Sequence, residues 1–191
     1  RNAESPSRLA VVFSMIQIVL FILTFLTTYM VGAGMSEHSG LIYSVPLLLI
    51  LGCHEGAHYF MCRQHGVRST PPNFIPAPFG PFGTFGAVIM MKDNLPHRRA
   101  AFDIGIAGPL AGFIIAVPCV VIGLYLSDIV PAAEVARNSE SYVQLGEPLL
   151  FRMVSDAIYG SLDGKELMLH PLGYAGWIGL LVTALNLLPA G

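Results

Sequence analysis

Charged residues are scarce in this sequence. They make up 12% of its 191 residues, against roughly 25% in an average soluble domain, which excludes an ordinary soluble domain. The net charge of −2 includes no basic stripe or tract, so nucleic acid is excluded as an expected partner. Cysteine is rare too. Cys53, Cys62 and Cys119 are odd in number and lack disulfide or zinc-finger spacing, and we expect them to serve in packing.

Hydrophobic residues are abundant by contrast, at 54% of the chain with a mean hydropathy of +0.65. A helix needs roughly 20 apolar residues to cross a bilayer core. Four runs approach this length: residues 9–31, 41–62, 100–126 and 172–188. The sequence therefore predicts an all-α multi-pass transmembrane protein of about four spans. We expect kinks or interruptions at Pro46, Pro109 and Pro118. In the third run, Gly108 and Gly112 have the GxxxG spacing that lets another helix approach closely.

The basic residues are distributed unevenly between these runs. Seven of them lie before the first run or between the second and the third: Arg1, Arg8, Arg63, Arg68, Lys92, Arg98 and Arg99. Residues 127–171 hold seven acids and only three basic residues. The positive-inside rule then places the N-terminus in the cytoplasm or stroma, and residues 127–171 in an acidic, non-cytoplasmic loop. This loop is either a solvated surface or a guard at the substrate entrance.

The segment 71–92, PPNFIPAPFGPFGTFGAVIMMK, is too rich in proline and glycine to form one helix. Its part GTFGAVIMM is apolar and uncharged, as in a β-strand. Irregular backbone at membrane depth persists only where protein or a watery cavity satisfies it. We therefore predict a re-entrant hairpin whose exposed edge binds an extended peptide by strand addition. The residues assigned to this edge are Gly83, Thr84, Phe85 and Gly86. The alternative is an interfacial loop that rests on the lipid headgroups.

The second run contains titratable residues in the apolar stretch LLLILGCHEGAHYF, namely His54, Glu55 and His58. Helical residues four apart share a face, so both imidazoles can bind one metal ion. This is the HExxH arrangement, in which zinc lowers the pKa of its water and Glu55 serves as general base and then acid. Hydrogen-bonded core histidines are the alternative. Inside a membrane span, however, such residues default to function.

A zinc hydrolase needs a third protein ligand and an open position. The soluble pattern HExxHxxGxxH is absent, because Met61 and Gln64 stand where it requires Gly and His. No carboxylate lies between Glu55 and Asp93 either. Asp103 is the only other acid at plausible membrane depth. It is either a ligand or, as we favour, a cap or interface residue.

Taken together, these residues resemble a known family. The membrane-embedded HExxH is followed by GTFG, by AGPLAG in the third run and by NLLP at the end of the fourth. This order is similar to that of the site-2 protease family of intramembrane zinc metalloproteases, over about residues 41–191. The branch it most resembles occurs in cyanobacteria, other bacteria and plant chloroplasts. The resemblance implies Zn²⁺ as cofactor, membrane proteins with transmembrane segments as substrates, and a bacterial inner membrane or plastid membrane as the surrounding lipid bilayer.

The resemblance also implies two further site residues. In the family, NxxP continues to a DG pair whose Asp is the third zinc ligand, and this sequence ends before that pair. We interpret residues 1–191 as one metalloprotease domain of a longer protein, with the Asp just beyond Gly191. Asn186 is implied to contact the substrate backbone or the oxyanion. Helix capping is its other interpretation.

The predicted function is therefore intramembrane zinc endopeptidase. Two other functions stay open on the same residues. One is a catalytically inactive homologue that acts as a binding or scaffold protein, and a full-length chain without an Asp after NLLPAG would favour it. The other is a metal or proton transporter that uses His54, Glu55 and His58 as a relay.

Overall fold

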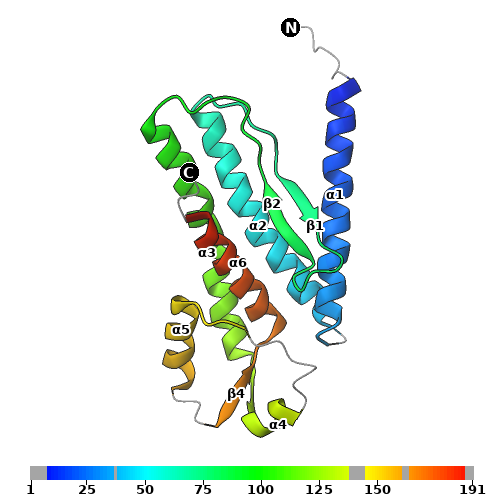
Figure 1. Ribbon diagram of the computed structural model, residues 1–191, viewed down its shortest axis with the longest axis vertical. Coiled ribbons are helices and arrows are strands. Elements are labelled where there is room, and N and C mark those ends of the chain that lie inside the picture. Colours follow the sequence, from blue (N-terminus) through cyan, green and yellow to red (C-terminus); the bar gives the residue numbers. More distant parts are fainter. Residues whose placement is uncertain (1–7, 37, 138–144, 161–163, 188–191) are drawn as a thin grey trace.

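The hydrophobic runs form long helices, which two small antiparallel sheets accompany (Figure 1). The computed structural model describes residues 8–36, 38–137, 145–160 and 164–187. In chain order the elements are α1 (Arg8–Ala33), α2 (Ser39–Gln64), β1 (Asn73–Pro76), β2 (Thr84–Val88), α3 (Arg98–Tyr125), β3 (Asp128–Pro131), α4 (Ala132–Arg137), α5 (Leu149–Tyr159), β4 (Lys165–Met168) and α6 (Pro171–Leu187).

Within the described residues, three helices are long and apolar enough to cross a membrane. They are Phe13–Ala33 in α1, the whole of α2 and the whole of α3. α6 has only 17 residues, fewer than the roughly 20 that a bilayer core requires. The mostly helical fold is thus confirmed, whereas the fourth span predicted at 172–188 is not.

The helices continue through their prolines. α2 contains Pro46, and α3 contains both Pro109 and Pro118 without a break. The interruption of the third run that we expected at Pro109 and Pro118 is therefore wrong. Each proline removes only one backbone donor. In apolar surroundings the remaining backbone groups have no partner better than the helix itself, and packed neighbours hold it in place.

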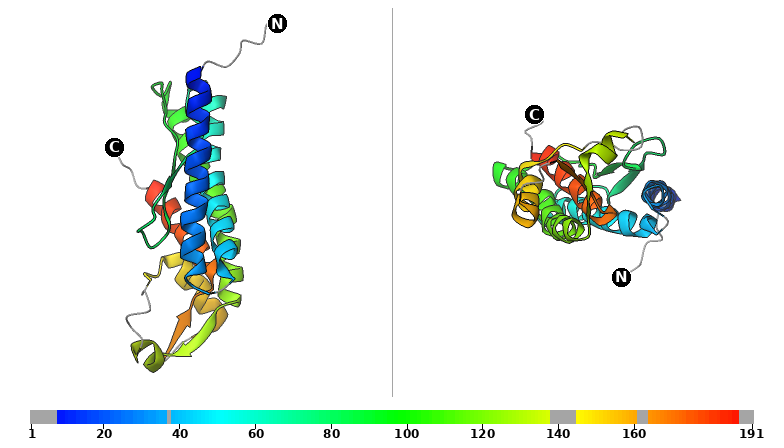
Figure 2. Two further views of the ribbon diagram at one scale, coloured as in Figure 1. Left: turned by 90° about the vertical axis from the view of Figure 1, so that its right-hand side faces the viewer. Right: turned by 90° about the horizontal axis from the view of Figure 1, so that it is seen from below.

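α3 packs between α2 and α6 in the core of the molecule. The fully buried Ala116, Val120 and Leu124 of α3 share one hydrophobic cluster with Ala175 of α6. The approach is close, since a Cβ on Gly176 would lie 2.7 Å from the backbone N of Val120. α1 stands apart from α3 and α6, with α2 and the first sheet beside it (Figure 2). The bundle of α2, α3 and α6 therefore fixes the second half of α2.

β1 and β2 form the hairpin that we predicted within residues 71–92. Asn73 pairs with Val88 and Phe74 with Ala87, and the register shifts before Pro76 pairs with Thr84. The phenyl rings of Phe74 and Phe21 meet edge to face, with centroids 5.1 Å apart, so β1 lies against α1. The depth of the hairpin in a membrane stays a prediction.

The connection 127–171 is more ordered than the acidic loop that we predicted. β3 pairs with β4 from Asp128 opposite Met168 to Pro131 opposite Lys165. In α5, Leu150, Val154 and Ile158 pack against the core. Their four-residue spacing is that of the inner face of a helix. This short helical pattern lies among the acidic residues of the connection that we predicted to be a loop.

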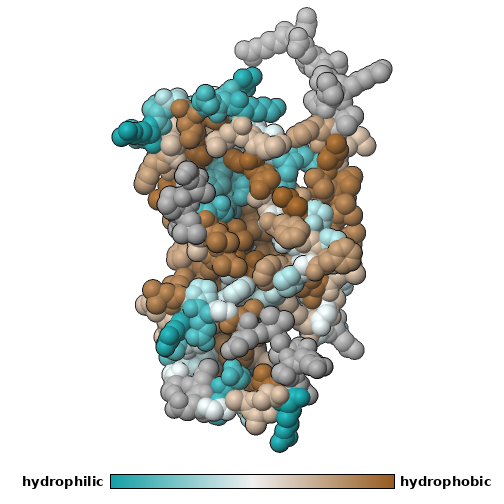
Figure 3. Space-filling view, in the orientation of Figure 1, coloured by the Kyte–Doolittle hydropathy of each residue, from teal (hydrophilic) through white to brown (hydrophobic). Residues whose placement is uncertain are grey.

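On the face shown in Figure 3, most residues around the middle are apolar, and hydrophilic residues gather towards the two ends. Side chains of α1 contribute much of the exposed apolar area; Met15, Ile18 and Met30, for example, are 60%, 59% and 72% exposed. Large exposed apolar surfaces mark membrane or protein contacts. α1 starts, α2 ends and α3 starts at one end of the molecule, whereas the acidic connection lies at the other (Figure 1).

Candidate metal centre

His54, Glu55 and His58 lie together in the second half of α2. One ligand atom from each lies within 4.8 Å of the other two, and the Nε2 atoms of His54 and His58 are 3.2 Å apart. His54 is fully buried and Glu55 is 7% exposed. At about 1.5 Å per residue, His54 lies about 15 Å along α2 from its end at Gln64. The two imidazoles therefore face each other deep in an apolar helix.

The ring of His58 is held by the backbone of α3. Its Nδ1 lies 2.6 Å from the carbonyl oxygen of Ile104, so Nδ1–H donates to that carbonyl and Nε2 is left as the free nitrogen. Gly108 provides the space for the ring, because a Cβ there would lie 2.1 Å from His58 Nε2. Any side chain at position 108 would occupy the site.

Gly112 serves His54 in the same way. A Cβ at this position would lie 2.9 Å from His54 Nδ1. Gly108 and Gly112 are four apart, as are His54 and His58, so each glycine of α3 receives one imidazole of α2. We had interpreted the GxxxG pair only as a point of close helix approach. The matching four-residue spacings are the signal that could have linked the glycines to the histidines.

The donor set fits a zinc ion. Zn–N bonds of about 2.0–2.1 Å at a near-tetrahedral angle separate two ligand nitrogens by about 3.3–3.4 Å. The observed separation of the two Nε2 atoms is 3.2 Å. Imidazole nitrogen is a preferred zinc ligand, and the hydrogen bond from His58 Nδ1–H to a carbonyl is a usual outer-shell partner. His54 and His58 are therefore able to hold zinc through Nε2.

Glu55 faces the hairpin. The backbone N–H of Ile89, the residue that follows β2, lies near its carboxylate. The carboxylate thus lies between the two imidazoles and the strand that we predicted to bind the peptide. This arrangement joins the expected general base to the expected substrate strand.

Comparison with known families agrees with this site. The sequence profile of Peptidase family M50 matches residues 42–191, which include most of α2 and His54, Glu55 and His58. The chain belongs to peptidase family M50. The resemblance to site-2 proteases is thereby confirmed. No solved structure matches this M50 chain.

Several relatives of this M50 chain are plant proteins. It is 38% identical over 147 residues to "Probable zinc metalloprotease EGY1, chloroplastic" of Arabidopsis thaliana, covering 76% of the chain and 26% of that protein. It is 36% identical over 155 residues to the EGY1 protein of Oryza sativa subsp. japonica, covering 80% and 26%. With "Probable zinc metalloprotease EGY2, chloroplastic" of Arabidopsis thaliana it shares 32% over 155 residues, covering 80% and 27%. The chain spans about a quarter of the length of these relatives.

The other residues that we assigned to the M50 site differ in their exposure and in their hydrogen bonds. Asn186 is exposed, and its side-chain amide donates to the carbonyl of Val182 one turn earlier, at 3.1 Å. Phe85 in β2 is 77% exposed. Thr84 is buried, and its hydroxyl donates to the carbonyl of Ile75. Their roles towards a substrate stay predictions.

Two glycines of the hairpin have left-handed backbone. Gly83 has φ of +73°, and a Cβ there would lie 2.7 Å from the backbone of Thr28. Its carbonyl accepts the hydroxyl of Thr27 at 2.6 Å. Gly86 has φ of +96° and open space at its Cβ position. Gly83 therefore attaches the hairpin to α1, whereas a Cβ on Gly86 would meet no neighbouring atom within 4 Å.

Asp103 is the interface residue that we favoured. Its carboxylate lies 3.0 Å from Nε2 of His65, just past the end of α2, and 3.8 Å from Arg99. Asp103 thus ties the start of α3 to the end of α2. The acid has partners of its own, away from His54 and His58, which leaves the third zinc ligand to another residue.

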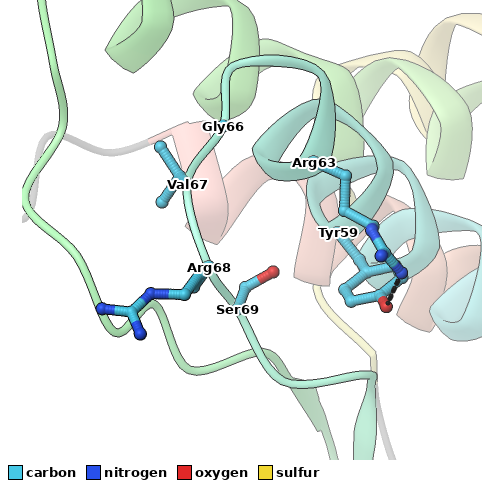
Figure 4. Close-up of a pocket in the computed structure, with 6 residues that line it drawn as sticks. All are labelled: Tyr59, Arg63, Gly66, Val67, Arg68 and Ser69. Carbon is cyan, nitrogen blue, oxygen red and sulfur yellow. Dashed lines mark hydrogen bonds between the residues drawn. The ribbon is translucent and has the colours of Figure 1, made fainter. Parts of the chain in front are cut away.

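A cavity of about 300 Å³ lies at the end of α2, beside the residues that follow it (Figure 4). Its lining consists of Tyr59, Arg63, Gly66, Val67, Arg68 and Ser69. Arg63 donates to the hydroxyl of Tyr59, whereas Arg68 extends the other way (Figure 4). Arg68 forms a two-pronged ion pair with Asp93, which closes the base of the hairpin. None of the HExxH side chains lines this cavity.

Proposed function

We propose that this M50 chain is part of an intramembrane zinc metalloendopeptidase that hydrolyses peptide bonds in or near the transmembrane segments of other membrane proteins. One observation carries the proposal: two imidazole Nε2 atoms converge to 3.2 Å beside a carboxylate, inside an apolar helix long enough to cross a membrane. Such polar groups are expensive at membrane depth and mark function. Relatives with chloroplastic names favour a plastid membrane as its location.

The chain's own residues divide the chemistry between them. Zinc, when bound, supplies a Lewis acid that polarises the substrate carbonyl and activates water for attack. His54 and His58 hold it through Nε2. Glu55 takes the proton of the attacking water and passes it to the leaving amine nitrogen. The third ligand is an Asp beyond Gly191, as the family resemblance implies.

The substrate binds as an added strand. A peptide bond within a helix is shielded by the helix's own hydrogen bonds, so an extended segment has to be held beside Glu55. Among the described strands β2 pairs only with β1, which leaves its other edge available for a peptide. The exposed Phe85 contacts the substrate's side chains, and Ile89 connects the strand to Glu55.

Asn186 completes the substrate contacts. Its Nδ2 now donates within α6, and the second hydrogen of the amide is available to a carbonyl oxygen that gains negative charge. Donors of this kind stabilise the developing oxyanion. In this proposal α6 delivers Asn186 and α2 delivers Glu55 to opposite sides of one peptide bond.

The test is the variant Glu55→Gln in the full-length protein, in detergent, with a single-span membrane protein as substrate. We expect bound zinc to be retained, because both histidines remain, and cleavage to fall by about 10²–10⁴-fold. Glu166→Gln in the exposed strand β4 is the matched control and keeps both properties. Unchanged cleavage by Glu55→Gln removes Glu55 from the mechanism. A wild type that holds zinc and cleaves no substrate favours the inactive homologue.

A further inference from the structure

His54 has a ring nitrogen without a partner. Its Nδ1 is buried, and it is one of four side-chain polar atoms in the described residues that are buried without a hydrogen bond. The partner histidine differs, because His58 Nδ1 bonds to the carbonyl of Ile104. A metal-binding histidine almost always donates its other N–H to an oxygen, which fixes the tautomer and the orientation of the ring. His54 therefore lacks the contact that His58 has.

Thr183 of α6 also has a buried polar atom without a hydrogen-bond partner. It is 5% exposed, and its hydroxyl is another of the four unpaired atoms. A threonine in a helix commonly donates its hydroxyl to a backbone carbonyl of the preceding turn. Thr24 and Thr28 of α1 do so, at 2.8 Å in each case. The Thr183 hydroxyl makes no such bond, so it is available to another element.

Both unpaired atoms lie against the same point of α3. A Cβ on Gly112 would stand 2.9 Å from Nδ1 of His54 and 3.2 Å from Oγ1 of Thr183. The missing side chain at Gly112 leaves space beside both atoms. A buried polar group without a partner destabilises a protein, so a hydrogen bond between these two atoms, direct or through a water, would remove both deficits.

We infer that Thr183 is a positioning residue for the metal centre: its hydroxyl oxygen accepts a hydrogen bond from Nδ1–H of His54, directly or through one water beside Gly112. With Nδ1 protonated, the lone pair of the neutral ring is on Nε2, which faces His58 Nε2. The inference rests on the proposed zinc peptidase and adds a residue of α6 to it. Through Thr183, α6 orients a ligand of α2 one turn before it presents Asn186.

A purely structural role for Thr183 makes a different prediction. Valine has nearly the shape of threonine and keeps the packing, but it lacks the hydroxyl. Serine keeps the hydroxyl and loses one methyl group. If Thr183 only fills space, Thr183→Val should disturb the protein less than Thr183→Ser. If its hydroxyl orients His54, Thr183→Ser should disturb the metal centre less than Thr183→Val.

The experiment measures metal affinity in the full-length protein, in detergent, by competition with a zinc chelator and by the absorption spectrum of the Co²⁺ form. Loss of an outer-shell partner commonly weakens metal binding by about 10–100-fold. We expect this loss and an altered Co²⁺ spectrum for Thr183→Val, and values near the wild type for Thr183→Ser. Thr24→Val removes an equally buried hydroxyl that bonds within its own helix, and as the matched control it keeps zinc affinity unchanged.

Gly112→Ala gives a second, independent variant. Its methyl group would lie 2.9 Å from His54 Nδ1 and 3.2 Å from Thr183 Oγ1, so it should disturb their interaction and weaken zinc binding as Thr183→Val does. The double variant should bind only as weakly as the weaker single variant, because both changes remove one interaction.

Two outcomes would overturn the inference while the proposed function stands. In one, Thr183→Val has the zinc affinity and Co²⁺ spectrum of a wild type that binds zinc and cleaves its substrate. In the other, Thr183→Ser loses as much affinity as Thr183→Val. A wild type that takes up no zinc overturns the inference and the proposed function together.

Discussion

Each ring nitrogen of a buried histidine needs a bonding partner. For the Nδ1 atoms of His54 and His58, these partners come from different helices. His58 relies on a backbone carbonyl of α3, which is present whatever the side chain at that position. His54 relies on a side chain of α6, in our inference, and so on the identity of one residue. Both rings depend on the absence of a Cβ opposite them, at Gly108 and Gly112. The chemistry of the site therefore depends on glycines as much as on ligands.

Gly108→Ala tests this dependence. The new methyl group would stand 2.1 Å from His58 Nε2, so the ring or α3 has to move, and we expect zinc affinity to fall by at least the ~10-fold that loss of an outer-shell contact produces. Zinc titration with a competing chelator measures the effect. Gly105→Ala adds the same atom on the same helix, where nothing lies within 4 Å, and it should bind zinc as the wild type does. Equal affinity for the two variants would show that the ring has room to spare.

The hairpin is the element that places a strand near Glu55 of α2. Contacts at its turn and at its base hold it in position. At its turn, the Gly83 carbonyl accepts a hydroxyl from α1, and the Phe82 carbonyl accepts the hydroxyl of Tyr43 in α2. At its base, Arg68 and Asp93 form an ion pair whose closest atoms are 2.7 Å apart. The free edge of β2 is thereby held in a fixed position relative to Glu55. In our proposal, a strand held this way needs no further ordering before it binds a peptide.

The ion pair at the base of the hairpin predicts a pH dependence. Hydrogen bonds from the Arg68 side chain and backbone lower the pKa of Asp93 from 3.8 to about 2. Because the folded pKa lies below the unfolded value, the contribution of this pair is complete above about pH 4. It is lost as the pH falls through about 2. It is also weakened by salt, since Arg68 is exposed.

Nuclear magnetic resonance of the Asp93 carboxyl carbon measures this pKa directly. In the wild type the resonance should titrate near pH 2, and in Arg68→Gln it should move towards the ordinary value of an aspartate. An Asp93 titration that Arg68→Gln leaves in place would contradict the role of this ion pair.

In the whole molecule, charge separates along the helix axes. The basic residues of 63–99 gather where α2 ends and α3 begins, and the acidic connection lies at the far end of α3 (Figure 1). The apolar middle between these ends (Figure 3) matches the three helices that are long enough to cross a membrane. HExxH lies nearer the basic end of α2. We expect water to reach Glu55 from that side.

This arrangement predicts that the two ends lie on opposite sides of the membrane. After replacement of Cys53, Cys62 and Cys119 by alanine, a cysteine is introduced either in place of the exposed Lys92 or in place of the exposed Arg152. A membrane-impermeant thiol reagent added to sealed vesicles should label only one of the two variants. The other should react only after the vesicles are opened. Labelling of both from the same side would contradict the predicted orientation.

The sequence by itself determined the local features of this protein. Lengths of apolar runs predicted α1, α2 and α3, and the four-residue spacing of His54 and His58 placed both on one face of a helix before any contact was known. Proline and glycine, together with the apolar, uncharged stretch GTFGAVIMM, indicated the hairpin at β1 and β2. Such features need only neighbouring residues, because helix and strand geometry repeats every few positions. The fourth span predicted from the same local patterns is unconfirmed, and these patterns did not indicate α5, where the pattern was short.

Only the tertiary structure decided what stands opposite those residues. His58 meets the carbonyl of Ile104 across 46 positions of sequence, and Gly112 brings His54 and Thr183 to one point. Nothing in the letters around Thr183 distinguishes it from any other threonine of an apolar helix. Its importance comes from the packing of α6 and α3, since helix packing joins residues that are distant in the chain and close-packed interiors leave each buried polar atom a very small choice of partners.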